Sequence, residues 1–254
     1  MTDVLGSELL KLRSVRSTAY LLLAIALLLA VGVVVSYLMT ADWDVAPPER
    51  RQRFDRADPA VPLLPFGQFC LGALGALAIT AEHGTGMIRP VLVGVPRRGR
   101  LLAAKAVVVA GVSLVVAAVA NLLAYVAGEL ITGNRPKPIS AYDSFGEALP
   151  TLLANTASLV LVALVGLGLG FVVRSTAGAL VTLCGLLFVL PVVALLLPRR
   201  WGEPLYSVLP PVLPPQLAGA EGSVLSPSGA GLVMIAYVVV ALGAGAVALV
   251  RRDA

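Results

Sequence analysis

Few residues of this chain could do acid–base or metal chemistry. Its only histidine, His83, stands next to Glu82. A zinc site needs three or four ligands at characteristic spacings, and His83 has no second histidine or cysteine at such a spacing. The paired acids or serine–histidine couple of an intramembrane protease are not apparent either. We therefore interpret His83 as a solvated residue at a helix end and expect no catalytic or metal site.

Nucleotide chemistry of the P-loop kind requires a glycine-rich turn that leads into Gly-Lys-Ser or Gly-Lys-Thr. The chain has three lysines, Lys11, Lys105 and Lys137, and none of them follows a glycine. We expect this chain to bind no cofactor and to be no enzyme by itself. Any energy from ATP hydrolysis would have to come from a partner protein.

The elements that carry these residues are predicted to be membrane-spanning helices. The chain of 254 residues is 58% hydrophobic and 13% charged, whereas soluble domains average about 45–50% and about 25%. Its mean hydropathy is +0.93, and several apolar runs reach the roughly 20 residues that cross a bilayer. Cys70 and Cys184 both lie in apolar runs and are interpreted as buried hydrophobic residues. The predicted fold class is an all-α polytopic membrane protein.

Six transmembrane helices are expected, and their orientation in the membrane follows from the positions of the lysine and arginine residues. These residues gather before the first span, in segment 82–100 and at the C-terminus, which predicts that all three are cytoplasmic. Four arginines in the first outer loop weigh against this orientation without reversing it, and the net charge of +5 reflects topology rather than nucleic-acid binding. The first apolar run is too long for a cleavable signal peptide. The spans are predicted at about 18–39, 64–81, 101–130, 150–173, 178–197 and 229–250, with outer loops 40–63, 131–149 and 198–228.

The stretch before the first span has the pattern of a basic amphipathic helix. One broad face carries five apolar residues, and polar side chains lie opposite. Such helices tend to lie in the membrane interface. The alternative is a basic tail that only fixes orientation. The domain prediction is thus an interfacial helix over 1–17 followed by a single transmembrane domain over 18–254. The apolar residues are Val4, Leu5, Leu9, Leu12 and Val15.

The last outer loop, residues 198–228, is rich in both proline and apolar residues. Its seven prolines are incompatible with one continuous helix, yet residues such as Leu209 and Leu213 are too apolar for a solvated loop. Short helical turns that re-enter the outer leaflet satisfy both facts, since irregular backbone survives at depth when protein covers it.

Polar residues inside the spans are the remaining candidates for a transport route. Such residues are costly in lipid and usually face protein or a water-filled path. They could line that path, or they could form hydrogen bonds between neighbouring helices, and we favour the second interpretation. The glycines of Gly166-Leu-Gly-Leu-Gly170 predict a close helix contact. The main polar candidates are Asn121, Asn155, Thr156 and Ser158.

Segment 82–100 differs from the other inner loops in the positions of its glycine and proline residues. Gly84 and Gly86 suit the exit from a helix, and Pro90 suits the start of a short one. Gly94 and Pro96 would stop it. A short helix here would expose the apolar residues between Met87 and Leu92 to a partner protein. The alternative is an interfacial loop whose apolar residues rest among lipid headgroups.

The chain resembles the permease subunits of type-2 ABC exporters, especially the compact actinobacterial kind. The likeness rests on Ser7-Glu-Leu-Leu-Lys-Leu-Arg-Ser before the first span and on Glu82-His-Gly-Thr-Gly-Met-Ile-Arg after the second. Pro96-Arg-Arg-Gly-Arg-Leu-Leu-Ala-Ala-Lys105 and the proline-rich outer loop add to it. The likeness extends over essentially the whole chain, although these patterns are less specific than a nucleotide-binding motif.

The resemblance implies a mechanism and a set of partners. In that family the N-terminal stretch is an elbow helix, and the segment after the second span is a coupling helix that docks on a cytoplasmic ATPase, which binds ATP and magnesium. Two permeases, identical or paralogous, and two ATPases form the exporter, and the loop before the sixth span forms re-entrant helices. Pro90 departs from the more usual continuous helix. The implied coupling positions are Glu82, Gly86, Met87, Ile88, Arg89 and Leu92.

The function predicted from the sequence is therefore a plasma-membrane permease that uses a separate ATPase to export its cargo. No ring of charges lines a span, which favours an amphipathic or lipid-like cargo over a small ion. A stand-alone membrane protein, such as a channel, a secondary carrier or an assembly factor, is the alternative from another class. A secondary carrier would more often show buried ions or repeat-related broken helices. A membrane enzyme is the third and weakest interpretation.

Overall fold

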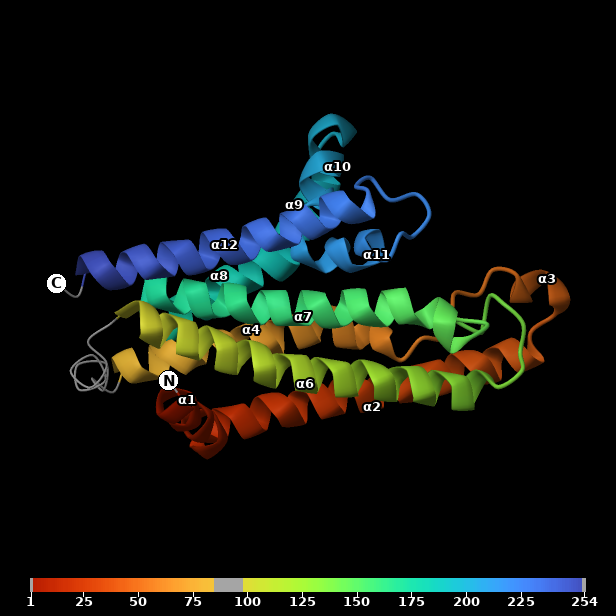
Figure 1. The fold of residues 1–254 in the computed structure, drawn as a ribbon. Helices are drawn as coiled ribbons and strands as arrows, with labels where there is room; N and C mark the ends of the chain where they lie inside the picture. Colours follow the sequence, from red (N-terminus) through yellow and green to blue (C-terminus); the bar gives the residue numbers. More distant parts are fainter. Residues whose placement is uncertain (1, 85–97, 253–254) are drawn as a thin grey trace.

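The computed structural model describes residues 2–84 and 98–252, and all regular elements among them are helical (Figure 1). Six of these segments are long and apolar enough to cross a membrane: α2, α4, α6, α7, the series from α8 to α9, and α12. The predicted all-α polytopic class is confirmed. The elements are α1 (Thr2–Ser14), α2 (Arg16–Val45), α3 (Pro48–Arg51), α4 (Ala60–Gly84), α6 (Arg98–Thr132), α7 (Phe145–Val173), α8 (Thr176–Cys184), η1 (Gly185–Val189), α9 (Leu190–Leu196), α10 (Arg199–Ser207), η2 (Pro210–Val212), α11 (Leu213–Leu217) and α12 (Pro227–Arg252).

Helices α4 and α7 form the centre of the bundle. Two thirds of the most apolar stretch of each, 67%, is buried, compared with 17% for α2. Glycines allow the two backbones to touch: a Cβ atom on Gly75 would collide with the carbonyl of Ala163, and one on Gly166 with the carbonyl of Gly72. The predicted close contact at Gly166 is thus an α4–α7 crossing, in which small residues permit dense packing without a hydrophobic drive from water.

The ends of α7 are fixed by local capping. The helix begins at Phe145 rather than at residue 150, because the Ser144 hydroxyl accepts the N–H of Glu147 at 3.3 Å and the Glu147 carboxylate accepts the N–H of Asp143 at 2.8 Å. The bond to Ser144 satisfies one of the N–H donors that a helix start leaves unpaired, and the bond to Glu147 fixes the residue before the cap. At the other end Arg174 adopts a left-handed φ of 57°, and Ser175 caps α8, which gives the tight turn expected after the fourth span.

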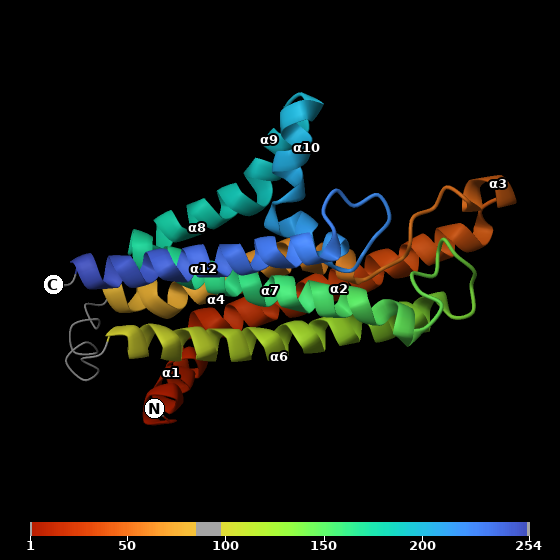
Figure 2. The same cartoon turned by 45° about the horizontal axis from the view of Figure 1, so that its top comes forward.

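The fifth span is not one regular helix. A π-helical turn, η1, joins α8 to α9, and Pro191 lies at the start of α9. Proline lacks an N–H for the carbonyl four residues earlier, so a widened turn before it is an expected adjustment. Helix α8 leans away from the bundle, and α9 and α10 project from its side (Figure 2).

The proline-rich segment returns from α10 to the bundle as a series of short turns. Helices α10, η2 and α11 are each interrupted near prolines, as predicted. Leu209 and Leu213 are buried, and they explain why this segment is so apolar. The helical turns are therefore confirmed, whereas their depth in the bilayer stays a prediction.

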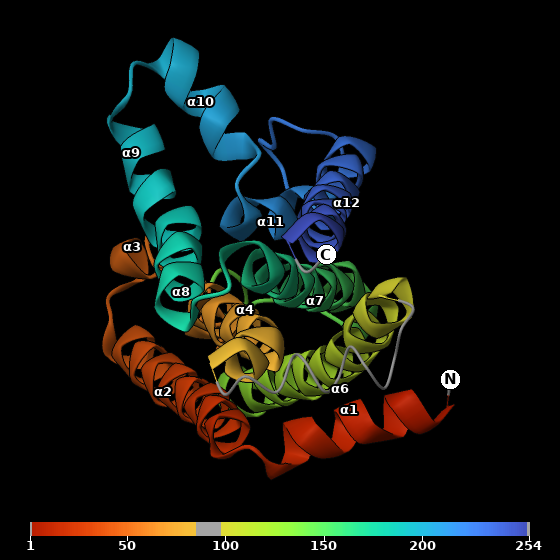
Figure 3. The same ribbon diagram turned by 90° about the vertical axis from the view of Figure 1, so that its left-hand side faces the viewer.

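The bundle has two distinct ends. The end that holds both chain termini, the end of α4 and the start of α6 is here named the base (Figure 1). The opposite end, named the far end, holds α3 and the connection between α6 and α7. Helix α1 runs across the base at a steep angle to the long helices (Figure 3). The predicted N-terminal helix is confirmed as a helix, while its place in the interface and the cytoplasmic position of the base stay predictions.

Candidate functional site: an ion cluster at the base

The predicted coupling segment begins and ends at the base. Glu82 lies in the last turn of α4, and α6 begins at Arg98. The other predicted coupling positions, Gly86, Met87, Ile88, Arg89 and Leu92, fall outside the described residues. The structure therefore describes the two helices that flank the segment and leaves the partner-contact prediction untested.

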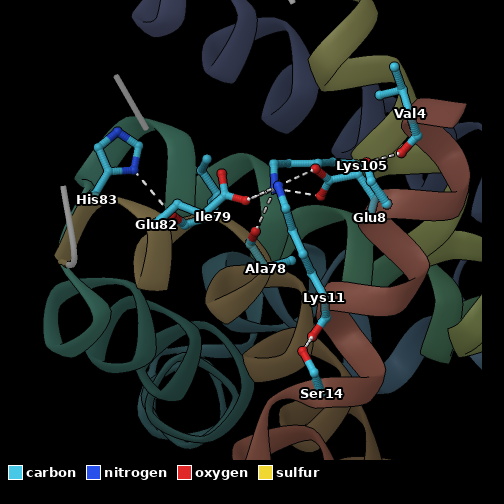
Figure 4. Close-up of polar contacts among 10 residues, drawn as sticks. Val4, Glu8, Lys11, Ser14, Ala78, Ile79, Glu82, His83 and Lys105 are labelled. Atoms are coloured by element: carbon cyan, nitrogen blue, oxygen red, sulfur yellow. Dashed lines mark hydrogen bonds and ion pairs between the residues drawn. The ribbon is translucent and has the colours of Figure 1, made fainter. Parts of the chain in front are cut away.

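Between these two helices Lys105 is the most deeply buried charged side chain among the described residues, at 1% exposure. Its ammonium group donates to Glu8 Oε2 at 2.7 Å, to Glu82 Oε1 at 2.8 Å and to the Ala78 carbonyl at 2.9 Å (Figure 4). A lysine ammonium has three donors, so these three contacts satisfy it completely. Lys105 thus joins α6 to both α1 and α4.

A second lysine reinforces this arrangement from α1. Lys11 Nζ lies 2.7 Å from Glu8 Oε1 and 2.9 Å from Glu82 Oε1. Its side chain is 37% exposed, whereas that of Glu8 is 6% exposed. We name these four residues, Glu8, Lys11, Glu82 and Lys105, the base ion cluster. Two carboxylates face two ammonium groups, so the cluster is balanced in charge.

Burial and pairing act in opposite directions on the Glu8 carboxyl. Burial by itself raises its pKa, but the charges and hydrogen bonds of Lys105 and Lys11 outweigh burial and hold the pKa below its usual range. For Lys11, burial lowers the pKa, and the hydrogen bonds of Glu8 and Glu82 more than compensate, so the pKa is raised. Both groups of α1 are therefore charged at neutral pH, and their ion pairs are formed.

Helical spacing explains how three elements converge on one point. Glu8 and Lys11 are separated by three positions on α1, and Ala78 and Glu82 by four on α4, so each pair lies on one helix face. The sequence prediction had named Glu8 and Lys105 as parts of the motifs that carry the resemblance and had not paired them. An available signal was Lys105 itself, because a charge within an apolar span requires a partner.

The space beside the cluster is mostly apolar. A cavity of about 290 Å³ lies between α1, α2, α4 and α6 and reaches Glu8, Lys11, Glu82 and Lys105 at its polar edge. Its walls are formed mainly by aliphatic side chains, among them Leu21, Leu74, Leu77, Val108 and Val109. The cluster therefore closes one side of a small apolar space under α1.

A comparison with known protein families identifies the family of this chain. The sequence profile of the family described as ABC-2 family transporter protein matches residues 4–189. The chain belongs to this family. The match contains the whole base ion cluster and the first four spans, ends within the fifth, and confirms the resemblance drawn from the sequence. A search of curated proteins returned no match at the threshold applied. This ABC-2 transporter chain is accordingly a multi-pass plasma-membrane permease of an ABC transporter.

Three of the four polar candidates within the spans of this ABC-2 permease bond to neighbouring helices or segments. Asn121 Nδ2 donates to Thr156 Oγ1 at 3.2 Å, and this bond links α6 to α7. The same group donates to the Ala117 carbonyl of its own helix at 3.0 Å. Ser158 Oγ accepts from Gln68 Nε2 at 2.7 Å. The same Gln68 group lies 3.2 Å from the carbonyl of Pro210 in η2. These are the contacts that the interhelix interpretation predicts.

Gln68 is a residue that the sequence prediction missed. It is fully buried in α4, at 0% exposure, and it holds the proline-rich segment to the bundle through Pro210. The signal was a single long amide side chain inside an apolar span, which is costly in lipid unless it bonds to protein.

Asn155 differs from the other three candidates of this permease. It is 7% exposed, and its side chain makes no hydrogen bond within the part of the chain that the structure describes. It lines a far-end cavity instead of bonding to a neighbouring helix. Asn155 is therefore the candidate whose environment fits the transport-route interpretation.

Proposed function

We propose that this permease is the membrane subunit of an ATP-driven exporter, which moves an amphipathic or lipid-like molecule outward with energy from a separate ATPase. ATP hydrolysis and magnesium binding are assigned to that cytoplasmic partner. The family supports a permease of an ABC transporter. The export direction, the ATPase partner and a second permease subunit are parts of the proposal.

The base ion cluster is the observation that carries the proposal. Glu82 precedes segment 85–97 and Lys105 follows it, and the two side chains lie 2.8 Å apart. Both also contact α1, through Lys11 and Glu8 respectively. A displacement of the segment by a partner would therefore move the ends of α4 and α6 and the elbow helix α1 as one unit.

This geometry changes the role proposed for Glu82. Its side chain is nearly buried and faces Lys11 and Lys105, so we assign it to positioning the coupling segment. The apolar residues between Met87 and Leu92 are the proposed docking contacts. They would fill a groove on the ATPase in the manner of a short helix in a hydrophobic groove.

The test is recovery of the ATPase with the purified permease. Co-expression with a candidate ABC-type ATPase and affinity capture through the permease should yield both subunits. Ile88→Asp together with Leu92→Asp should reduce recovery of the ATPase by about tenfold or more, because two buried apolar contacts are replaced by charges.

A matched control uses the same change at the far end. Phe145→Asp together with Leu149→Asp alters two exposed residues of α7, at 50% and 39% exposure, and should leave ATPase recovery unchanged. Full recovery with the Ile88/Leu92 variant, in a protein that elutes as a folded single species, would contradict the coupling assignment. Equal losses in both variants would contradict it as well.

A further inference from the structure

The far end of the molecule contains a cavity of about 650 Å³ that the base ion cluster does not explain. It lies between the start of α4, the first turns of α7, the connections on either side, and the segment that follows α11. Its volume is within the range of about 300–1,000 Å³ that small-molecule sites occupy. We name it the far-end cavity.

One face of α7 supplies a polar stripe to this cavity. Glu147, Thr151 and Asn155 follow one another at intervals of four residues and all line it, as side chains on one helix face must. Asn155 is the deepest of the three by burial, with 7% exposure. The stripe continues one turn further to Ser158, which bonds to Gln68.

The amide of Asn155 is the clearest mark of a ligand. Its amide atoms are not fully enclosed by protein, so they keep access to the cavity that Asn155 lines. Asn155 bonds to none of the residues in 2–84 and 98–252, although Asn121 on the neighbouring helix has two acceptors. An amide that faces a cavity in this state can both donate to and accept from a bound molecule.

The remaining polar groups give the cavity an acidic character. Three carboxylates line it, those of Asp58, Glu147 and Glu221, against the single guanidinium of Arg56. Lys137, outside the cavity, is paired with Glu147 at 2.7 Å. Burial raises the pKa of Asp58 despite the N–H of Ala60 and the charge of Arg56, so this carboxyl would gain from a further cation.

Tyr142 adds a hydroxyl in the same cavity, with its side chain buried at 9% exposure. Burial and the charge of Asp58 raise its pKa, and its hydroxyl bonds to Thr151 and Arg56, so the neutral phenol positions these polar groups at the cavity wall. The opposite wall is apolar and is formed by Val61, Leu64 and Pro65 of α4. Polar groups on one wall and aliphatic groups on the other match an amphipathic molecule, which has a polar end and an apolar end.

We propose that the far-end cavity binds an amphipathic organic cation, whose protonated amine faces Asn155 and Asp58 and whose apolar body lies against the start of α4. The statement that the bound molecule is exported cargo rests on the proposed function. Binding itself needs neither the ATPase nor transport, so its test and the test of ATPase recovery can fail independently.

The experiment measures binding of two matched fluorescent probes to the full-length permease in zwitterionic nanodiscs. Dansylcadaverine has a protonated amine on an alkyl chain, and dansyl-6-aminohexanoate has a carboxylate on a similar chain. The amine should bind saturably above the signal of empty nanodiscs, and the carboxylate should bind at least about tenfold more weakly, because like charges in the cavity repel it. Equal binding of the two probes would overturn the proposal.

Variants then locate the site. Asn155→Leu and Asp58→Asn should each weaken binding of dansylcadaverine by about tenfold, which is the loss expected for one hydrogen bond or ion pair to a charged group. Thr182→Val is the matched control, since Thr182 is an exposed hydroxyl residue of α8 whose bond is to its own helix; it should leave the affinity unchanged. Unchanged affinity in folded Asn155→Leu would overturn the site.

A second variant keeps the test decisive if Asn155→Leu does not fold. Ala220 is exposed at the edge of the cavity, so Ala220→Trp should occupy part of it without removing a polar group. We expect this variant to lose most of the dansylcadaverine binding. Full affinity in Ala220→Trp would show that the probe binds elsewhere and would overturn the proposal.

Discussion

The base ion cluster and the far-end cavity are both polar regions in an otherwise apolar bundle, and they differ in how their polar groups are satisfied. At the base Lys105 makes three contacts of 2.7–2.9 Å, all within the chain. At the far end Asn155 is almost as buried and bonds to none of the described residues. A group whose partners all belong to the chain holds the fold together. The Asn155 amide lines a cavity and has no such partner among the described residues, so it is available to a molecule from outside.

The largest effect is expected from removing the centre of the base ion cluster. Lys105→Met should lower the free energy of unfolding by about 3–5 kcal/mol, because two buried carboxylates would then share only the partly exposed Lys11. Lys11→Met should cost at most about 1 kcal/mol, since Lys11 is partly exposed and Lys105 still neutralises both carboxylates. Chemical unfolding in detergent micelles measures both. Equal losses of unfolding free energy in the two variants would show that the burial of Lys105 does not increase its contribution to stability.

A smaller effect separates the two asparagines. Asn121→Leu should destabilise the protein by about 1 kcal/mol, because it breaks the α6–α7 hydrogen bond to Thr156. Asn155→Leu should change stability by less than about 0.5 kcal/mol, because no hydrogen bond to the described residues is lost. The same unfolding assay compares them. A larger loss for Asn155→Leu would contradict its assignment to ligand binding.

The smallest effect is a difference in pH dependence between the two ends. The folded pKa of Glu8, which faces Lys11, Lys105 and Glu82, is below its ordinary 4.5. Its stabilising contribution is therefore present above pH 4.5 and is lost as the pH falls through the folded pKa. Glu8→Gln should accordingly be less stable than the wild type at neutral pH, and the difference should shrink in acid.

The sign is opposite for Asp58, which faces Arg56 and Tyr142. Its folded pKa is above the ordinary 3.8, so its favourable contribution is present below pH 3.8 and is lost as the pH rises through the folded pKa. Asp58→Asn should therefore be more stable than the wild type at neutral pH. Melting temperatures from pH 3 to 8 test both variants. The same pH dependence of stability in both would contradict the predicted difference between the two ends.

Local signals in the sequence were sufficient for the number of spans and for the turns that follow the fifth. Apolar length predicted six helices, and prolines predicted the short turns after the fifth span. Helix ends were less accessible: the early start of α7 depends on the bonds that Ser144 accepts from Glu147 and Glu147 accepts from Asp143, which a hydropathy window does not register. The same limit applies to η1, where one proline widens a turn inside an apolar run.

Polar partnerships could not be assigned from the sequence, because they join positions that are distant in the chain. Glu8 and Lys105 are separated by 97 positions, and Gln68 and Pro210 by 142. Asn121 and Asn155 have the same side chain and similar apolar surroundings in the sequence. Only the packing of α6 against α7 gave the first a partner and left the second facing a cavity.

The sequence by itself determined that the chain crosses a membrane as helices, that prolines divide the segment after the fifth span into short turns, and that segment 82–100 is unlike the other loops. These properties follow from composition and from the local chemistry of glycine and proline, which act within a few residues. The tertiary structure decided which charges meet at the base and which amide faces a cavity at the far end. Contact and burial decide those roles, and both arise only when distant helices pack together.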